Sequence, residues 1–419
     1  MNGFYRIGQR AGDGRWTLED GDGRPFYSLG VNCFNYDLGE PMEAYLMDRY
    51  GGVGWFGRWA GAKLDGVKEL GFNTLGAWHS RYYWNSKVPK TIEIRCSQKA
   101  NRVNNGWGGY GFPDVFDPSF AASAHSAMAD TYHASGASLV DDRSVIGVYT
   151  DNELHWWGTG GHWGQDDPGS ATNGTNLVED YIHLPANAPG KRAWIDYLRE
   201  RYGDIGRLNA AWNAEYDTFE ELLWLREYRA AEPAYGDDKL GFLRRIAETY
   251  FRTTTDILRQ YDGNHLLLGC RMVGTSTPDV VLEAMKPYVD ALSLNYYCFE
   301  LPEAWIARAH RITGKPVIIT EFSFSAGSSA GFDLITNGAQ LAHVRDQKRR
   351  GESYRDFVTQ AARMPFMLGT HWFALYDFWD RQGLIGNYGL YDRKDELWSE
   401  FAEAVKETHA ALAPVLAGR

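Results

Sequence analysis

Residues 145–156 read Val145-Ile-Gly-Val-Tyr-Thr-Asp-Asn-Glu-Leu-His-Trp156 and decide the fold of the chain. The stretch begins as an apolar run, which is typical of a strand buried on both faces of a parallel sheet. It then changes abruptly to Asp151, Asn152 and Glu153. In a parallel α/β barrel, the carboxyl ends of the strands carry the chemistry. The stretch therefore predicts a barrel strand that ends in a candidate site.

A second stretch, Lys315-Pro-Val-Ile-Ile-Thr-Glu-Phe-Ser-Phe324, has the same form and runs from apolar residues to Glu321. Two glutamates that follow two buried strands resemble the paired carboxyl groups that glycosidases place on either side of a sugar ring. Taken alone, either glutamate is better explained by an ion pair with an arginine or by a helix cap. Both together, on strands of the appropriate order, favour catalysis.

The rest of the chain alternates apolar strand patterns with amphipathic helix patterns, which predicts a parallel sheet. Eight strand–helix units in 419 residues favour an α/β fold of the single (β/α)8 TIM barrel type with elaborated loops. We expect one domain over residues 1–419, with a hairpin at 1–25 and an insertion at 154–240 between strands 4 and 5. The expected strands are 26–35, 72–78, 91–95, 145–151, 265–271, 290–296, 316–320 and 367–376. The expected helices include 59–70, 119–134, 239–260, 302–312 and 397–412, with two more that begin near residues 278 and 354.

Composition excludes some classes of partner. The chain has 43 Lys and Arg against 54 Asp and Glu, a net charge of −11, which argues against nucleic acid because phosphate binding needs a basic surface. No apolar run reaches the length of a membrane span. The N-terminal residues lack the apolar region of a signal peptide, so we expect a cytoplasmic location, although a leader removed earlier is compatible with the same residues. The oligomeric state is left open.

Aromatic residues make up 15% of the chain, and several tryptophans lie among Gly, Asn, His and Asp residues. Trp78 and Trp156 are two of these, and such rings often line a cleft and stack on the apolar face of a ligand. The alternative is that the large loops have small cores of their own. His79 and His371 are candidates for hydrogen bonds to substrate hydroxyls. Because the four cysteines and the histidines show no metal-ligand spacing, we expect no metal and no cofactor.

Hydrolysis with retention needs one carboxyl group that protonates the leaving oxygen and a second that attacks the anomeric carbon, about 5–5.5 Å away. The amide of Asn152 is suited to a sugar 2-hydroxyl, so we assign Glu153 as acid/base and Glu321 as nucleophile. Tyr296 is a candidate partner of Glu321, and a tyrosine in the barrel wall is the alternative. Trp372 is a candidate platform beneath the sugar at the −1 position.

The order of these elements resembles the clan-A glycoside hydrolases, and most of all the catalytic domain of the family-50 β-agarases. The chain shares five short motifs with that family, spread over about residues 14–400: Gly30-Val-Asn32, Phe112-Pro-Asp-Val-Phe-Asp117, Asp151-Asn-Glu153, Asn264-His-Leu-Leu-Leu-Gly-Cys-Arg271 and Gly369-Thr-His-Trp-Phe373. In clan A, an Asn-Glu pair ends strand 4 and the nucleophilic Glu ends strand 7, and Asn152, Glu153 and Glu321 match this pattern. Asn32 joins the substrate-binding candidates.

The resemblance implies a retaining, agarase-like or β-galactosidase-like glycoside hydrolase that acts on a carbohydrate substrate. Family-50 agarases usually carry a further N-terminal sandwich domain, whereas this chain starts almost at the barrel. Its loops at 40–60 and 157–190 depart from the family pattern, and loops set substrate choice on this fold. Activity on other β-glycosides (glucosides, glucuronides or mannosides) therefore stays open, as do transglycosylation, exo or endo action and a non-catalytic carbohydrate-binding barrel.

Overall fold

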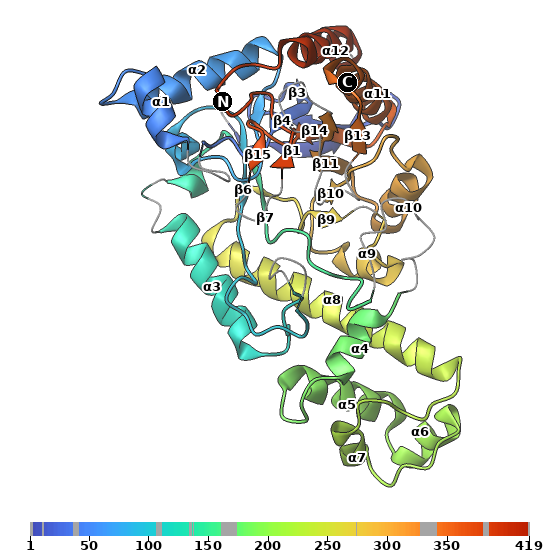
Figure 1. Cartoon of the computed structure of the whole chain (residues 1–419). Coiled ribbons are helices and arrows are strands. Elements are labelled where there is room, and N and C mark those ends of the chain that lie inside the picture. Colours follow the sequence, from blue (N-terminus) through green and yellow to red (C-terminus); the bar gives the residue numbers. More distant parts are fainter. Residues whose placement is uncertain are drawn as a thin grey trace.

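The fold is given by a computed structural model that describes residues 3–10, 12–36, 42–105, 111–133, 136, 138–160, 174–273, 275–326, 342–379 and 385–417. In this part of the chain, helices lie around a curled parallel sheet (Figure 1). The sheet contains nine described strands in the order β8-β7-β6-β5-β4-β14-β11-β10-β9. Their bounds are β4 Ser28–Val31, β5 Thr74–Leu75, β6 Lys90–Glu93, β7 Val145–Tyr149, β8 Leu266–Leu267, β9 Met272–Val273, β10 Leu292–Asn295, β11 Val317–Phe322 and β14 Met367–Trp372. Each predicted strand range overlaps one of these strands.

The two edge strands of the sheet, β8 and β9, belong to one stretch of chain. The fifth strand, predicted as a continuous element over 265–271, is thus split into two short pairings. Gly269 and Arg271 have φ angles of +82° and +51°, which interrupt the extended backbone between them. The stretch still bonds to both neighbours: the Leu268 N–H donates to the Val148 carbonyl at 2.9 Å, and the Asp290 N–H donates to the Leu267 carbonyl at 2.8 Å. The sheet therefore curls into at least a half-barrel.

Amphipathic helices pack their apolar sides against the sheet, and their side chains join those of the strands in the main core. They are α1 Glu43–Arg49, α2 Trp55–Glu69, α3 Pro118–Tyr132, α8 Ala234–Tyr261, α9 Asp279–Met285, α10 Glu303–Thr313, α11 Gln347–Arg363 and α12 Ser399–Ala417. The helix expected to begin near residue 354 begins earlier, because the Asp346 side chain accepts a hydrogen bond from the Arg349 N–H and caps it. Within the described ranges, none of the helices is both long and apolar enough to cross a membrane.

The stretch predicted as an insertion forms a helical lobe that extends away from the sheet, with α5, α6 and α7 at its far end (Figure 1). Its helices are α4 Asn176–Ile182, α5 Pro189–Tyr202, α6 Ile205–Trp212 and α7 Phe219–Trp224. Asp238, near the start of α8, links this helix to α6 and α5. It accepts hydrogen bonds from Trp212 Nε1 at 2.6 Å and from Tyr202 Oη at 2.7 Å. Part of the loop predicted at 157–190 is helical instead, and residues 161–173 of it lie outside the described ranges.

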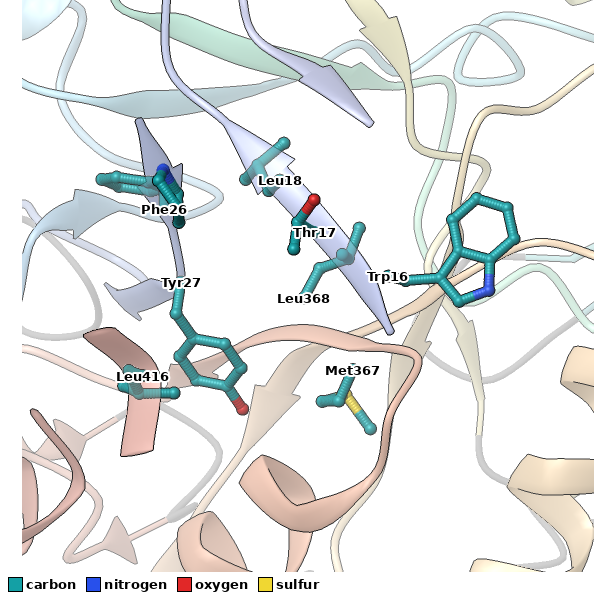
Figure 2. Close-up of a pocket in the computed structure, with 9 residues that line it drawn as sticks. Trp16, Thr17, Leu18, Phe26, Tyr27, Met367, Leu368 and Leu416 are labelled. Atoms are coloured by element: carbon teal, nitrogen blue, oxygen red, sulfur yellow. The ribbon is translucent and has the colours of Figure 1, made fainter. Parts of the chain in front are cut away.

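Three short antiparallel strands precede the parallel sheet: β1 Arg6–Gln9, β2 Trp16–Glu19 and β3 Pro25–Phe26. Tyr5 and Leu18 from this sheet pack against Ile146, Ile318 and Leu368, which lie near the amino ends of β7, β11 and β14. Figure 2 shows the adjoining pocket, where β2 and β3 meet β14 and Leu416 of α12. It holds only about 10 Å³, so it has room for about one water molecule. The N-terminal strands therefore leave little space at this end of the sheet, and a site is expected at the opposite end.

Candidate active site

The carboxyl ends of the strands carry a cluster of residues with left-handed backbone. Cys33, Trp78, Glu153 and Arg271, which follow β4, β5, β7 and β8, have φ angles of +53°, +60°, +51° and +51°. Such a conformation costs a non-glycine residue roughly 1–2 kcal/mol, so it persists only where the surrounding structure holds it. Its concentration at one end of the sheet marks that end as the candidate site.

Asn295, the last residue of β10, brings the two predicted catalytic glutamates together. Its Nδ2 donates to Glu153 Oε1 at 2.8 Å and to Glu321 Oε2 at 3.5 Å. Its Oδ1 accepts from the Thr320 hydroxyl at 2.9 Å, which fixes the orientation of the amide. Residues from β7, β10 and β11 thus converge on one amide nitrogen. Asn152 belongs to the same group, because its Oδ1 accepts from the same nitrogen at 3.2 Å.

Glu321 lies on β11 with its side chain only 6% exposed, and two donors besides Asn295 contact its carboxylate. Arg271 Nη2 forms an ion pair with Oε2, and the Tyr297 hydroxyl donates to Oε1. Burial raises the pKa of Glu321, and the Arg271 charge and the Tyr297 hydrogen bond act in the opposite direction. Both donors favour the ionised carboxylate, which is the form that a nucleophile needs.

The surroundings of Glu153, by contrast, favour its protonated form. Burial and the charge of Glu321 raise the pKa of Glu153 above its usual range, against the hydrogen bond from Asn295 and the charge of Arg271. No cation contacts this carboxyl group within 4 Å among the described residues. Two neighbouring carboxyl groups cannot both ionise easily in a buried site, so the proton belongs on Glu153. The pair can therefore offer one acid and one anion at the same pH.

Arg271 was not predicted as a site residue. It is fully buried, and its guanidinium lies 4.3 Å from the ring centre of Trp78 and 5.4 Å from that of Tyr149. Its Nε and Nη1 have no hydrogen-bond partner among the described residues. The sequence signal that could have identified Arg271 is a single cationic residue directly after the run 265–270. Asn295 lies near the end of the predicted strand 290–296, and Tyr297 follows it directly.

Asp151 supports the turn that carries Glu153. Its Oδ1 accepts from the Ser97 N–H at 3.0 Å and the Ser97 hydroxyl at 2.8 Å, and its Oδ2 accepts from Tyr250 Oη at 2.8 Å. Burial raises the pKa of Asp151 to about 7, against these hydrogen bonds. The side chain is 3% exposed and points away from the glutamate pair toward the β6–α3 loop and α8. Asp151 therefore has a structural role: its hydrogen bonds hold the turn that carries Glu153.

Two of the predicted aromatic contacts move by one residue. The hydroxyl that reaches Glu321 belongs to Tyr297, whereas Tyr296 lies in the main core and its N–H donates to the Glu321 carbonyl. Trp372 is fully buried beside Phe322, Tyr354 and Phe401, so it is not a platform at the mouth. The half-buried Phe373 faces the site instead, with its ring centre 6.3 Å from those of both Tyr297 and Trp78.

Two further residues that were predicted to bind substrate make contacts within the fold instead. Asn32 is fully buried, and its amide donates to the Thr320 carbonyl at 2.8 Å and accepts from the Ala77 N–H at 2.9 Å, so it joins three strands. Trp156 stacks on Phe251 with ring centres 5.6 Å apart in the core beneath the insertion. Neither side chain is available to a substrate in this arrangement.

The two histidines are buried within the curled sheet, and burial favours their neutral form. His371 is fully buried and its Nε2 lies 2.8 Å from the Ser28 hydroxyl, while burial lowers its pKa to about 3. His79 is 8% exposed, its Nδ1 donates to the Gly76 carbonyl at 2.7 Å, and burial lowers its pKa to about 4. His79 Nε2 has no partner among the described residues and stays open to a hydroxyl donor.

The described residues contain no group of three or more His, Cys, Asp or Glu side chains placed to hold a metal ion. The four cysteines are free thiols and buried. The chemistry available at this end of the sheet is therefore that of the two carboxyl groups, the Asn295 amide, the Arg271 guanidinium and the Tyr297 hydroxyl.

Comparison with known proteins gives a consistent picture. No protein-family model matches the chain. The chain is 26% identical to beta-agarase B and 28% identical to beta-agarase A, both from Vibrio sp. (strain JT0107), over 94% and 84% of its own length. It spans about two-fifths of these relatives, 41% and 36% of their lengths.

Solved structures show the same fold. A crystal structure of an agarase superposes with a TM-score of 0.84 at 22% identity, over 99% of this chain and 66% of that one. An exo-beta-agarase superposes with a TM-score of 0.84 at 22% identity, over 100% of this chain and 65% of that one. The fold is thus similar to that of these agarases, and the longer chains continue beyond the part that is shared.

Proposed function

We propose that this chain is a retaining glycoside hydrolase that cleaves β-galactosidic linkages of agarose-type polysaccharides by double displacement. Glu321 attacks the anomeric carbon, and Glu153 gives its proton to the leaving oxygen and then activates water. The similarity to two beta-agarases supports the substrate class. The resemblance to clan A, with the acid after strand 4 and the nucleophile on strand 7, supports the roles.

The Asn295 bridge is the observation that carries this proposal. Since one nitrogen lies 2.8 Å from Glu153 Oε1 and 3.5 Å from Glu321 Oε2, those oxygens are no further apart than the sum of these distances. Such closeness is compatible with the roughly 5–5.5 Å between the carboxyl groups of retaining enzymes, in which the second carboxylate attacks directly.

We further propose that the curled sheet closes into a (β/α)8 barrel through the stretch 266–273, which supplies both edge strands and bonds to β7 and β10. Residues 1–419 then form one catalytic domain, with 1–25 at the barrel floor and 154–240 inserted after strand 4. Asn152, Trp78, His79 and Phe373 are the substrate-binding candidates whose positions fit this site.

The test is hydrolysis of agaro-oligosaccharides and a panel of aryl β-glycosides, with proton NMR of the first product formed. A β-configured first product from agaro-oligosaccharides is expected. An α-configured first product would overturn the retaining mechanism. Turnover of a glucoside, glucuronide or mannoside alone would replace the agarose assignment, and sugar transfer in preference to hydrolysis would identify a transglycosylase. Binding without turnover of any member would favour a carbohydrate-binding barrel.

A further inference from the structure

A third glutamate, Glu93, lies at the end of β6 and has no role in the mechanism above. Its side chain is 5% exposed, and its backbone lies opposite Tyr149 in the β6–β7 register. Tyr149 in turn lies against the Arg271 guanidinium that contacts Glu321. Glu93 therefore faces the same interior as the catalytic pair, one strand away from Glu153.

The wall of the sheet is incomplete beside Glu93. Strands β5 and β6 pair only through Leu75 and Lys90, whereas β6 and β7 pair through four residues. A cavity of about 400 Å³ lies next to the gap, between the 3-10 helix η1 Arg81–Asn85, the end of β6 and helix α3, and Glu93 lines it. On that side Arg95 Nε lies 3.3 Å from Glu93 Oε1. The carboxylate is thus held between a polar cavity and the catalytic interior.

The charged and titratable groups around Glu93 come from every neighbouring strand. On the interior side these are Cys33, Tyr149, Glu153, Arg271 and Glu321, while Asp151 interacts with Glu93 from the side of the β6–α3 loop. On the cavity side they are Arg81, Arg95, Lys99 and Asp130, of which Arg81 and Asp130 pair with each other at 2.5 Å. The cations that act directly on Glu93 are therefore Arg95 and Arg271.

These surroundings set the charge of Glu93 and its effect. Burial raises the pKa of Glu93, and Arg95 and Arg271 favour its ionised form. Burial and the Glu321 charge raise the pKa of Glu153, and the Glu93 charge makes a smaller contribution in the same direction, as it also does for the pKa of Glu321. A fixed negative charge in a water-poor interior acts over several ångströms, because little solvent screens it.

We propose that Glu93 is a positioning residue of the catalytic centre, which supplies the fixed negative charge that keeps the proton on Glu153, while Arg95 holds it from the cavity side. The inference rests on the proposed function, since it assigns Glu153 as the acid. It also explains why β6 ends in a buried carboxylate next to two others, an arrangement that is costly unless the charge is used.

The test is the pH dependence of kcat/KM for agaro-oligosaccharide hydrolysis by Glu93→Gln. Without the charge of Glu93, Glu153 loses its proton at lower pH, so the basic limb is expected to move down by about 0.5–1 pH unit. Glu93→Asp keeps the charge and should keep the limb near its wild-type position. Arg81→Gln removes a charge of the same cavity whose partner is Asp130, and should leave the limb unchanged.

An unmoved basic limb in Glu93→Gln would overturn the proposal, and so would an equal loss of rate at every pH, which is what a structural role predicts. Near-UV circular dichroism checks the fold, and Glu93→Ala carries the same expectation where the Gln variant does not fold. Absence of wild-type turnover would count against the proposed function instead, so the two failures are distinguishable.

Discussion

The two glutamates of the site differ in the residues that contact them. Glu321 forms an ion pair with Arg271 and accepts a hydrogen bond from Tyr297, whereas Glu153 accepts a hydrogen bond from the Asn295 amide and forms no ion pair with any described residue. The same burial therefore has different consequences for the two side chains. The proposed mechanism uses this asymmetry to assign one glutamate as the anion and the other as the acid, and each assignment can be tested one residue at a time.

Glu153→Gln should lose activity mainly on substrates with poor leaving groups. The amide cannot donate a proton to the leaving oxygen, so kcat/KM on agaro-oligosaccharides should fall by roughly 10²–10⁴-fold. An aryl β-glycoside with an acidic phenol needs little protonation and should lose far less in the first step. The matched variant is Glu321→Ala, which should lose activity on both substrates. Added azide should restore turnover and give a product of inverted configuration. Wild-type rates in both variants would contradict the assignment.

Tyr297→Phe should move the acid limb of the pH profile upward. The Tyr297 hydroxyl donates to Glu321 Oε1 and stabilises its ionised form, so its loss raises the pKa of Glu321. The hydrogen bond to a charged group is worth about 1.5–3 kcal/mol, which corresponds to a fall in kcat of about 10–100-fold at neutral pH. Tyr296→Phe is the control, because the Tyr296 side chain lies in the main core and should leave the acid limb in place. Equal limbs in wild type and Tyr297→Phe would argue against this role.

At the scale of elements, β7 and β8 approach each other closely where Gly147 lies. A Cβ atom at Gly147 would lie 2.6 Å from the Leu266 carbonyl oxygen and 2.8 Å from Leu268 Cγ, and backbone cannot move away as a flexible side chain can. Glycine therefore permits the pairing that places the turn 151–153 beside the stretch 268–271. The same strand pair brings Glu153 next to Arg271, whose carbonyl accepts from the Glu153 N–H at 3.2 Å.

Gly147→Ala should lower the free energy of unfolding by roughly 1–3 kcal/mol, because the added methyl forces β7 and β8 apart. Urea unfolding followed by circular dichroism measures this change. The matched control is Gly61→Ala in α2, where nothing lies within 4 Å of the added Cβ, and a gain of about 0.5–1 kcal/mol is expected from helix propensity. A Gly147→Ala protein as stable as wild type would show that the pairing tolerates a wider spacing.

Element by element, the strand order was predictable, but the direction of side chains near strand ends was not. Register shifts occur between Leu294 and Asn295 and between Ile319 and Phe322. Both shifts place one extra residue in β11, next to Thr320 and Glu321. An extra residue exchanges the inner and outer faces of a strand, since side chains alternate with a period of two, so the alternation of the sequence does not give the side-chain directions at this end of β11.

At the scale of the whole molecule, buried carboxyl groups outside the site set how stability depends on pH. Asp377 is fully buried after β14 and accepts from the Asn387 amide at 3.0 Å, the Gly389 N–H at 2.8 Å and Trp398 Nε1 at 3.0 Å. Burial raises the pKa of Asp377 to about 7, against the charge of Arg350. The folded protein therefore binds this proton more tightly than the unfolded chain does.

The free energy of unfolding should accordingly fall as pH rises from about 4 to about 7. Over this range the unfolded Asp377 is ionised while the folded one keeps its proton, so the unfolded state is favoured as pH increases, by roughly 2–4 kcal/mol for this residue. Asp151, with a pKa of about 7, acts in the same direction. Asp377→Asn does not titrate, so its stability relative to wild type should increase across this window in urea titrations at several pH values. A constant difference would contradict the prediction.

The sequence was sufficient to predict an α/β fold with a parallel sheet and to single out the two glutamates that Asn295 joins. Apolar runs that end in Glu153 and Glu321 are local patterns, and alternation of strands and helices follows from the periodicity of burial. Only the tertiary structure decided that Asn295, Arg271 and Tyr297 surround those glutamates, and that Asn32, Trp156 and Trp372 do not. The physical reason is that contacts between distant segments depend on register shifts and left-handed residues, which arise from packing of the whole sheet and leave little trace in local sequence.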